Sequence, residues 1–410
     1  MMFDWLALTL FIVACLVIIY HHVGYPLLLR IMSRSHPTPT PYFHRHFTIT
    51  PLDLMLPRIC LVMPAHNEAD TISDKIYNLG TLDYPDNKLR IIIVCDGCTD
   101  ETADIARGAA KARENRHLTI DVVEKPENYG KVAVLNEAIS LCDCDVVALS
   151  DVSALLSIDS LLVTASQLSE EDTGVVCGSY QFFQSLSAGE QAYWAYQRQI
   201  KTSESAIGAT LGAHGAFYAF RHKLFERLPP DTINDDFVLP VNIVMKGYKC
   251  LYDPRIVAVE LEQACNEMDF NRRKRIAAGN IQQAIRCIGL LQPRFGKIAF
   301  NFFSGKFLRP MMPVFLFLAL LSSAWLSVEH WFFTLAFVGQ LTAYVVSILY
   351  IVTGSQPVWK PLRVLYYIIS GHLAMSIGLL RYAMGLESGQ LKKVEPGSET
   401  KRSKGSTQGV

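Results

Sequence analysis

Long apolar segments stand at both ends of this chain and constrain its fold more than any other feature. The first covers residues 5–20 and continues more weakly to residue 29, and three more cover residues 311–326, 331–350 and 364–384. Each is near or above the length that a helix needs to cross a hydrocarbon core of ~30 Å. The chain is therefore expected to be a membrane protein whose polar middle folds as a separate domain.

Charge on the two sides of the first apolar segment predicts its orientation. The segment is too long for the core of a signal peptide and has no basic segment before it. Arg30, Arg34 and Arg45 follow it. The positive-inside rule then places the following domain in the cytoplasm, which predicts a multi-pass protein of the inner (cytoplasmic) membrane.

The chain divides into six predicted segments. They are a transmembrane helix (1–30), a proline-rich linker (31–57), a catalytic domain (58–265), basic amphipathic helices at the membrane surface (266–308), two to three transmembrane helices (309–385) and a disordered polar tail (386–410). Four spans that begin outside would leave the basic tail outside, against the charge rule. Either one C-terminal segment is only interfacial, or the tail breaks the rule.

The polar middle alternates strand patterns with helical patterns. Strands are expected over residues 59–63, 89–95, 118–123, 145–149 and 173–178, and helices over residues 69–79, 99–113, 132–141 and 158–168. Such alternation predicts an α/β domain whose mostly parallel sheet is covered on both faces. Ligands of such sheets bind at the carboxyl ends of the strands.

The overall charge and the cysteines narrow the possible partners. Basic and acidic residues balance at 38 each, so no global field attracts nucleic acid. Two close cysteine pairs, Cys95/Cys98 and Cys142/Cys144, are candidate ligands of a zinc site. Such a site needs its ligands arranged in a tetrahedron. The second pair has no histidine nearby, so we expect reduced cytoplasmic thiols.

Acidic residues follow the strand patterns in a fixed order. Asp96 ends the run IIIVCD, Asp151 follows VVALS, and Asp235 and Asp236 stand together in INDDFVLP. Acids at strand ends point into the ligand crevice, where they suit a phosphate-bearing ligand, a divalent metal and a proton to be removed. Each also has a structural explanation as a turn residue or helix cap.

The motifs in this order resemble the family 2 glycosyltransferases. PAHNE (64–68) is followed by DGCTD (96–100), GKVAVLN (130–136) and a short Asp motif at Asp151, and the similarity covers about residues 58–280. The resemblance implies an inverting enzyme with a glycosyltransferase-A fold. The membrane segments on both sides resemble those of the polysaccharide synthases in this family.

The resemblance also assigns residues to the sugar donor. Glu68 and Asp96 match positions that hold the nucleotide, and Lys131 matches a lysine near the diphosphate. For Asn67 and Glu68, the start of a helix is the structural alternative. The full set of matching donor positions is Pro64, Ala65, Asn67, Glu68, Asp96, Gly97, Lys131, Asp151, Arg272 and Arg275.

Asp151 matches the first acid of the family's Asp-x-Asp motif, which holds a divalent metal. Ser153 replaces the second acid. Because a hydroxyl is also an oxygen ligand, we expect Mg²⁺ or Mn²⁺ at Asp151 and Ser153, bound more weakly than by two carboxylates.

Catalysis is assigned to the acid pair. Asp236 matches the general base and Asp235 its neighbour, and a carboxylate beside another acid tends to have a raised pKa. Upstream, His214 and Gly215 in LGAHGAF match the acceptor-side loop. For His214 a packed loop histidine is the alternative, and for the acid pair a helix cap.

The last family motif, Gln-x-x-Arg-Trp, is altered. Arg272 stands at the Gln position, Arg275 at the Arg and Ile276 at the Trp. Arg275 keeps the charge that clamps a diphosphate in catalysis. The missing aromatic ring weakens the case for long-chain synthesis, and the basic run also suits an interfacial helix on lipid phosphates.

Together these features predict a membrane-integrated inverting glycosyltransferase. Its donor would be a nucleotide sugar, expected to be a UDP-sugar. Its acceptor would be a lipid-linked or growing polysaccharide in exopolysaccharide or cell-surface glycan synthesis. Its partners would be membrane lipid and possible membrane subunits, and not nucleic acid. The first alternative is a single transfer to a polyprenyl phosphate or lipid-linked oligosaccharide. A non-catalytic membrane scaffold with the same fold is the second, and a transporter is disfavoured by the few intramembrane charges.

Overall fold

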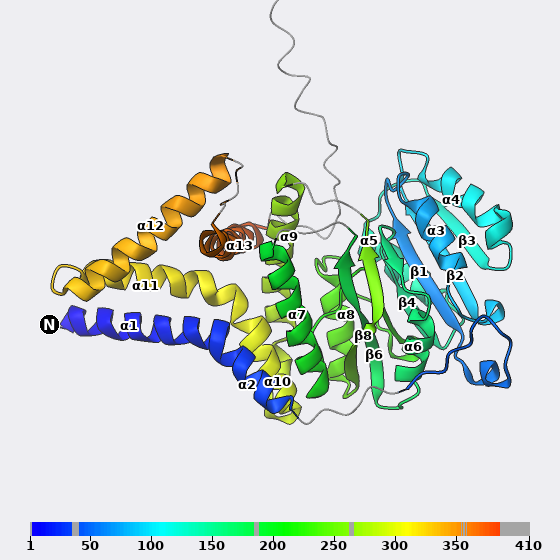
Figure 1. The fold of residues 1–410 in the computed structure, drawn as a ribbon, viewed down its shortest axis with the longest axis horizontal. Helices are drawn as coiled ribbons and strands as arrows, with labels where there is room; N and C mark the ends of the chain where they lie inside the picture. Colours follow the sequence, from blue (N-terminus) through cyan, green and yellow to red (C-terminus); the bar gives the residue numbers. More distant parts are fainter. Residues whose placement is uncertain are drawn as a thin grey trace, which may run out of the picture.

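The computed structural model describes residues 2–34, 41–183, 188–261 and 266–385, except residues 354, 356 and 358. The predicted tail and part of the predicted linker therefore lie outside the described residues. Figure 1 shows two parts: helices of membrane length on one side and an α/β domain on the other. The N-terminus lies at the end of the molecule that is far from the sheet.

One mixed sheet forms the centre of the α/β domain. Its strands run in the order β3-β2-β1-β4-β7-β6-β8-β5. Their bounds are Ile59–Ala65 (β1), Leu89–Asp96 (β2), Thr119–Lys125 (β3), Val146–Leu149 (β4), Ala154–Leu156 (β5), Thr173–Phe182 (β6), Tyr218–Arg221 (β7) and Lys249–Glu260 (β8). The pairs β1–β2, β1–β4, β2–β3 and β6–β8 are parallel, which confirms the predicted mostly parallel sheet.

Helices cover both faces of the sheet, as predicted. Their bounds are Ile72–Gly80 (α3), Thr102–Lys111 (α4), Lys131–Ser140 (α5), Ser160–Gln167 (α6) and Asp235–Met245 (α8). Alternate residues of β1 separate the two cores: Leu61 packs with α3, α4 and α6, whereas Val62 packs with α5 and α8. This follows from the two-residue period of a strand, and it explains why the central strands are apolar throughout.

Strands β5, β7 and β8 and the helix Ala188–Ala206 (α7) were missed from the sequence. β5 and β7 are only three and four residues long. β8 contains Asp253, Pro254 and Arg255, and its register with β6 shifts between Cys177 and Ser179. These segments lack a clear local pattern, because their neighbours in the sheet decide their conformation.

The membrane-length helices meet the domain through buried polar contacts. In the part of the chain that the structure describes, four helical segments are long and apolar enough to span a membrane: Met2–Met32, Lys297–Leu326, Trp331–Thr353 and Pro361–Ala383. Within the first, α1 (Met2–Ile19) continues through a short π-helix into α2 (Tyr25–Met32). On α2, the Tyr25 hydroxyl donates to Glu204 Oε1 of α7 at 2.8 Å, in a buried position.

Helices α1 and α11 (Met312–Leu326) lie antiparallel. Trp325 Nε1 donates to Asp4 Oδ1 at 3.1 Å at one end. At the other end, the Tyr20 hydroxyl lies 2.6 Å from Ser304 Oγ, in the segment that leads into α11. The end of α1 and the start of the Lys297–Leu326 segment therefore both lie on the domain side.

Helix α13 (Lys360–Ala383) packs against α9 (Asn266–Arg286) rather than only against the other membrane-length helices. A Cβ on Gly378 would lie 2.6 Å from the Cβ of Ala277, so the glycine allows close approach. The Arg273 guanidinium lies 4.8 Å from the centre of the Tyr367 ring. In Figure 1, α13 is seen nearly end-on, whereas α1, α11 and α12 (Trp331–Thr353) lie across the picture.

Part of the segment predicted to be a linker packs onto the domain. Residues Pro51–Met55 form a 3₁₀ helix. The buried Arg45 side chain, 7% exposed, donates from Nε to Asp53 Oδ1 at 2.9 Å and from Nη1 to Asp83 Oδ1 at 2.8 Å. This arginine ties the residues before β1 to the loop after α3.

We predict that Arg45→Ala destabilises the protein by about 3–5 kcal/mol, because it leaves two buried carboxylates without their partner. Arg58→Ala is the matched control, since Arg58 makes an exposed ion pair with Asp143 and is worth at most about 1 kcal/mol. Circular dichroism of the detergent-solubilised variants would measure Tm. Equal Tm values for the two variants would show that the Arg45 pairs do not anchor this segment.

Candidate active site

The carboxyl edge of the sheet brings together four of the predicted site residues. Asp151 follows β4, Lys131 begins α5, and Asp235 and Asp236 are the first residues of α8. Lys131 Nζ lies 3.0 Å from Asp151 Oδ1 and 3.6 Å from Asp235 Oδ2. Three elements that are distant in sequence therefore meet at one ammonium group.

The charge balance of this site is negative. Burial lowers the pKa of Lys131, but the nearby carboxylates of Asp151, Asp235 and Asp236 outweigh burial and raise it overall. Lys131 therefore stays protonated. Three carboxylates against one ammonium leave an excess of two negative charges when all are ionised.

The two adjacent acids of α8 have different surroundings. Asp235 is buried, and its Oδ2 atom accepts no hydrogen bond within the described structure but lies within ion-pair distance of Lys131. Asp236 is half-buried. Among the residues that the structure describes, none forms a hydrogen bond or an ion pair with its carboxylate. Burial and the charge of Asp235 raise the pKa of Asp236 to about 6, although Lys131 opposes this shift.

The loop before β7 supports both Asp151 and α8. The Asp151 N–H donates to the Gly215 carbonyl at 3.1 Å, and the Ala213 N–H donates to the Asp236 carbonyl at 2.8 Å. A Cβ on Gly215 would lie only 2.7 Å from Asp151 Oδ2. Glycine at this position therefore leaves the space in which the Asp151 carboxylate lies.

His214 of the same loop belongs to an aromatic group. Its ring stacks on Tyr180 of β6, with centroids 5.2 Å apart and planes 24° apart, and its centroid lies 5.5 Å from that of Trp194 of α7. Sequence reasoning missed Tyr180 and Trp194, because isolated aromatic residues look like ordinary core. An indole thus stands beside the predicted acceptor loop, although Ile276 replaces the tryptophan of the altered family motif.

Asp96 is tied to the start of α5. Its buried carboxylate accepts the N–H of Tyr129 at 2.9 Å on Oδ1 and the N–H of Gly130 at 2.8 Å on Oδ2. Gly97 follows with a φ of +59°, and a Cβ there would lie 2.3 Å from the Asn128 nitrogen. Asp96 and Gly97, predicted to bind the nucleotide, therefore also fix the turn that presents Lys131.

Residues 64–68 connect the ends of β1 and β2. Pro64 and Ala65 pair with β2. Asn67 has a φ of +56° and accepts the Thr99 N–H at 2.8 Å, and the Glu68 N–H donates to Thr102 Oγ1 at 2.8 Å. These contacts join the segments that follow β1 and β2 at the carboxyl edge of the sheet, so the predicted structural and donor-binding roles are compatible.

Helix α9 carries the predicted arginines. The Arg272 side chain lies outside the described structure. Arg275 is half-buried, and the described residues offer it no hydrogen bond or ion pair. Asn234, which precedes α8, donates to Gln283 Oε1 at 3.1 Å and packs on Gly279, where a Cβ would lie 2.4 Å away. Asn234 thus holds the helix of Arg275 against the helix of Asp236.

Lys75 is a supporting residue that the sequence did not reveal, because a lysine on amphipathic α3 is expected to face solvent. It is fully buried, and its Nζ donates to Ser150 Oγ at 2.7 Å and to the Ala154 carbonyl. Burial lowers the pKa of Lys75 to about 7. Lys75 therefore holds both ends of the loop that carries Asp151 and Ser153.

The residues at this edge fit a divalent metal. Asp151 and the half-buried Ser153 offer oxygen ligands, as hard cations prefer. Within the described residues, the buried Asp235 Oδ2 atom accepts no hydrogen bond, and the carboxylates of Asp151, Asp235 and Asp236 outnumber the ammonium of Lys131. A divalent cation there would be held by Asp151 and Ser153.

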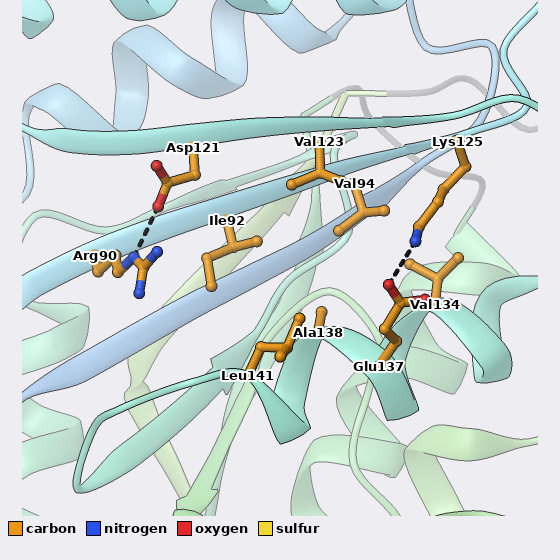
Figure 2. Close-up of a pocket in the computed structure, with 10 residues that line it drawn as sticks. All are labelled: Arg90, Ile92, Val94, Asp121, Val123, Lys125, Val134, Glu137, Ala138 and Leu141. Atoms are coloured by element: carbon orange, nitrogen blue, oxygen red, sulfur yellow. Dashed lines mark hydrogen bonds and ion pairs between the residues drawn. The ribbon is translucent and has the colours of Figure 1, made fainter.

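A groove of about 110 Å³ on the α5 face of the sheet lies apart from these residues (Figure 2). Ion pairs lie at two places along it, Arg90–Asp121 at 2.7 Å and Lys125–Glu137 at 2.5 Å. The lining residues are Arg90, Ile92, Val94, Asp121, Val123, Lys125, Val134, Glu137, Ala138 and Leu141. None of them belongs to the predicted site.

Comparison with known proteins identifies the domain. Residues 60–228 match the profile of glycosyl transferase family 2. The chain carries a family 2 glycosyltransferase domain. It has a TM-score of 0.70 to a mannosyltransferase from Pyrobaculum calidifontis in complex with GDP-Man and Mn²⁺, at 23% identity over 92% of this chain and 100% of that chain. This likeness confirms the predicted glycosyltransferase-A fold.

Named relatives are glycosyltransferases of polysaccharide and glycolipid synthesis. The poly-beta-1,6-N-acetyl-D-glucosamine synthase of Staphylococcus epidermidis is 23% identical over 60% of each chain. The beta-monoglucosyldiacylglycerol synthase of Synechocystis is 26% identical over 72% of this chain and 63% of that protein. The chain thus covers less than two thirds of the length of these relatives.

We predict that Gly215→Ala lowers glycosyltransferase activity by about 10- to 100-fold, because the new methyl group displaces the Asp151 carboxylate. Gly108→Ala in α4 is the control, since a Cβ there meets nothing within 4 Å. Release of nucleoside diphosphate from a nucleotide sugar, with Mn²⁺ added, measures the effect. Equal activity of the two variants would mean that the Asp151 carboxylate tolerates displacement.

Proposed function

We propose that this protein is a membrane-bound inverting glycosyltransferase that moves a sugar from a nucleotide sugar to a lipid-linked or growing polysaccharide acceptor at the cytoplasmic face. The observation that carries the proposal is the difference between the surroundings of Asp235 and those of Asp236. Lys131 engages Asp151 and Asp235, whereas the half-buried Asp236 carboxylate is left with a raised pKa. A carboxylate of this kind suits a general base.

In the proposed reaction, Asp236 accepts the proton of an acceptor hydroxyl as that oxygen attacks the anomeric carbon. The bond between this carbon and the diphosphate breaks, and the diphosphate leaves with the bonding electrons. Lys131 and Arg275 hold the diphosphate oxygens, with Arg272, Glu68 and Asp96 at the donor side. A divalent cation, when bound by Asp151 and Ser153, supplies further charge neutralisation of the leaving group.

We predict that Asp236→Asn lowers the turnover number by about 100-fold or more while nucleotide-sugar binding is retained, because the base acts in the chemical step. Asp172→Asn, in an exposed pair with Lys249, is the control. In the wild type, activity falls below a pH of about 6, where Asp236 becomes protonated. An unchanged turnover number in the Asp236 variant would refute the assignment.

A panel of UDP- and GDP-sugars, tested for release of nucleoside diphosphate with and without Mg²⁺ or Mn²⁺, tests the function as a whole. The family resemblance leads us to expect a UDP-sugar and metal dependence. If no sugar of the panel is bound or hydrolysed by the purified protein, the non-catalytic scaffold becomes the better explanation.

Cations gather where the catalytic domain meets the membrane-length helices. Lys201 Nζ donates to the Gly212 carbonyl at 2.5 Å, next to the acceptor loop. The charge of Lys306 interacts with those of Lys201, Arg309, Glu204 and Asp236. Lys201, Lys306 and Arg309 outnumber the carboxylates of Glu204 and Asp236, and Glu204 is already bonded to Tyr25, so the junction favours an anionic acceptor.

This cationic junction supports the second candidate, a single transfer to a polyprenyl phosphate or other lipid-linked acceptor. Ile276, where processive relatives have a tryptophan, supports it as well. The glycolipid synthase among the relatives acts on a lipid by its name. Product length separates the two candidates, since a single added sugar excludes polymer synthesis.

Because α13 packs on α9, we propose a topology in which three helices span the membrane. In this arrangement α1, α11 and α12 cross the membrane, and α13 lies at the surface beside the catalytic domain. The basic residues Lys392, Lys393, Lys401, Arg402 and Lys404 of the tail then follow a segment on the cytoplasmic side. This resolves the conflict with the positive-inside rule.

A reporter fused after Gly385 is predicted to be cytoplasmic. Green fluorescent protein at this position should fluoresce, and alkaline phosphatase should be inactive, in a bacterial host. Fusions after Glu329, in the turn between α11 and α12, are the matched control with the opposite result expected. Active phosphatase after Gly385 would instead support four spans.

A further inference from the structure

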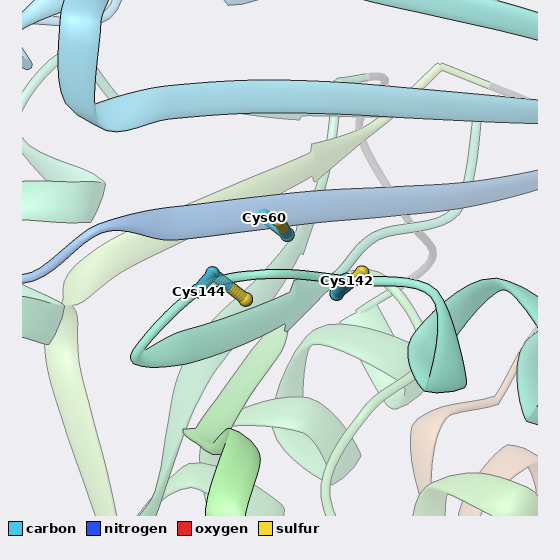
Figure 3. Close-up of side chains that lie close together, drawn as sticks. All are labelled: Cys60, Cys142 and Cys144. Atoms are coloured by element: carbon cyan, nitrogen blue, oxygen red, sulfur yellow. The ribbon is translucent and has the colours of Figure 1, made fainter.

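Three buried cysteines come together on the α5 face of the sheet. Cys60 is the second residue of β1, and Cys142 and Cys144 lie in the turn between α5 and β4. Their Sγ atoms all lie within 4.8 Å of one another (Figure 3). Their exposed fractions are 1%, 6% and 9%, so the thiols face the protein interior.

This thiol cluster differs from the arrangement considered from the sequence. The sequence suggested Cys95/Cys98 as the possible partner pair of Cys142/Cys144. The fold instead places β1 beside β4, with Cys60 opposite Val147, and so adds one sulfur to this pair. A cluster of three sulfurs at one point has the donor set that soft metal ions select.

We propose that Cys60, Cys142 and Cys144 form a binding site for a soft, thiophilic metal ion, Zn²⁺ or Cu⁺. Both ions share the same chemistry here: each binds thiolate sulfur, and binding releases the thiol protons to solvent. Cu⁺ is satisfied by three sulfurs, whereas Zn²⁺ adds a fourth ligand, such as a water or a carbonyl oxygen. No carboxylate or histidine of the described residues joins the three sulfurs within 4.8 Å.

Cys60 is the thiol of this cluster that loses its proton most readily. Hydrogen bonding with Cys142 and Cys144 lowers the pKa of Cys60, and the positive charge of Arg90 acts in the same direction. The pKa values of Cys142 and Cys144 are raised instead. A thiolate at Cys60 is therefore better tolerated than its burial alone would allow.

The groove on the sheet lies beside the cluster. Its lining includes Arg90, which is the β2 partner of Cys60, and Ala138, whose carbonyl accepts the Cys142 thiol at 3.2 Å. Leu141 precedes Cys142 and lines the groove as well (Figure 2). An ion entering the groove would thus come close to the sulfurs.

This sulfur site is separate from the oxygen site at Asp151. The thiols lie at the end of α5 and before β4, whereas Lys131 and Asp151 lie at the opposite ends of these elements. A helix of the length of α5 separates its ends by about 15 Å. A bound ion would join the end of α5 and the start of β4 to β1, on the side of these elements that is remote from Lys131 and Asp151.

Metal loading of the full-length protein in detergent tests the proposal. The reduced protein, freed of metal under anaerobic conditions, is loaded with Zn²⁺ or, in a separate arm, with Cu⁺. Elemental mass spectrometry after gel filtration should find one tightly held ion per chain in at least one arm, with a raised Tm. Substitution with Co²⁺ should give an ultraviolet sulfur-to-metal charge-transfer band.

Cys142→Ser should abolish the tightly held ion and the charge-transfer band. Cys177→Ser is the matched control: Cys177 is equally buried and lies 3.6 Å from Cys250 in a two-sulfur pair, so this variant should still bind metal. As a check that does not depend on folding of a variant, metal should protect Cys60, Cys142 and Cys144 of the wild type from alkylation. Absence of a tightly held ion in both arms, or equal binding by the two variants, would overturn the proposal.

Discussion

The ammonium of Lys131 among three carboxylates is the interaction on which the rest of the site depends. It joins β4, α5 and α8 at one point, because it pairs with Asp151 and lies within ion-pair distance of Asp235. Without this cation, ionised carboxylates so close together, one of them buried, would be unfavourable. The surrounding structure is arranged to hold it: Asp96 fixes the turn before Lys131, and Lys75 fixes the loop around Asp151.

A second constraint couples this site to the membrane part. Buried polar contacts such as Tyr25 with Glu204 connect α2 to α7, and Lys201 of α7 donates to Gly212 in the predicted acceptor loop. On the other side, α13 packs on α9, which Asn234 holds against the start of α8. The proposed base therefore lies between two connections to the membrane helices, an arrangement that suits an acceptor delivered from the lipid side.

Much of the site was predictable because its residues carry local signals. A strand pattern that ends in an acid predicts a residue at the carboxyl edge of the sheet, and the structure places Asp96 at the end of β2 and Asp151 after β4. Lys75, Tyr180 and Trp194 carry no such signal, since a single lysine or aromatic residue is common on any helix or strand. Only their neighbours in space, Ser150 and His214, show what they do.

The sequence by itself determined the α/β fold class, the membrane-length helices and the order of the acids, because hydrophobic periodicity and motif spacing are local properties. The tertiary structure decided how the members of each group differ. It buried Asp235 beside Lys131 and left Asp236 half-buried, it brought Cys60 to Cys142 and Cys144, and it laid α13 against α9. These outcomes depend on contacts between distant segments, and a local pattern does not specify which segments will meet.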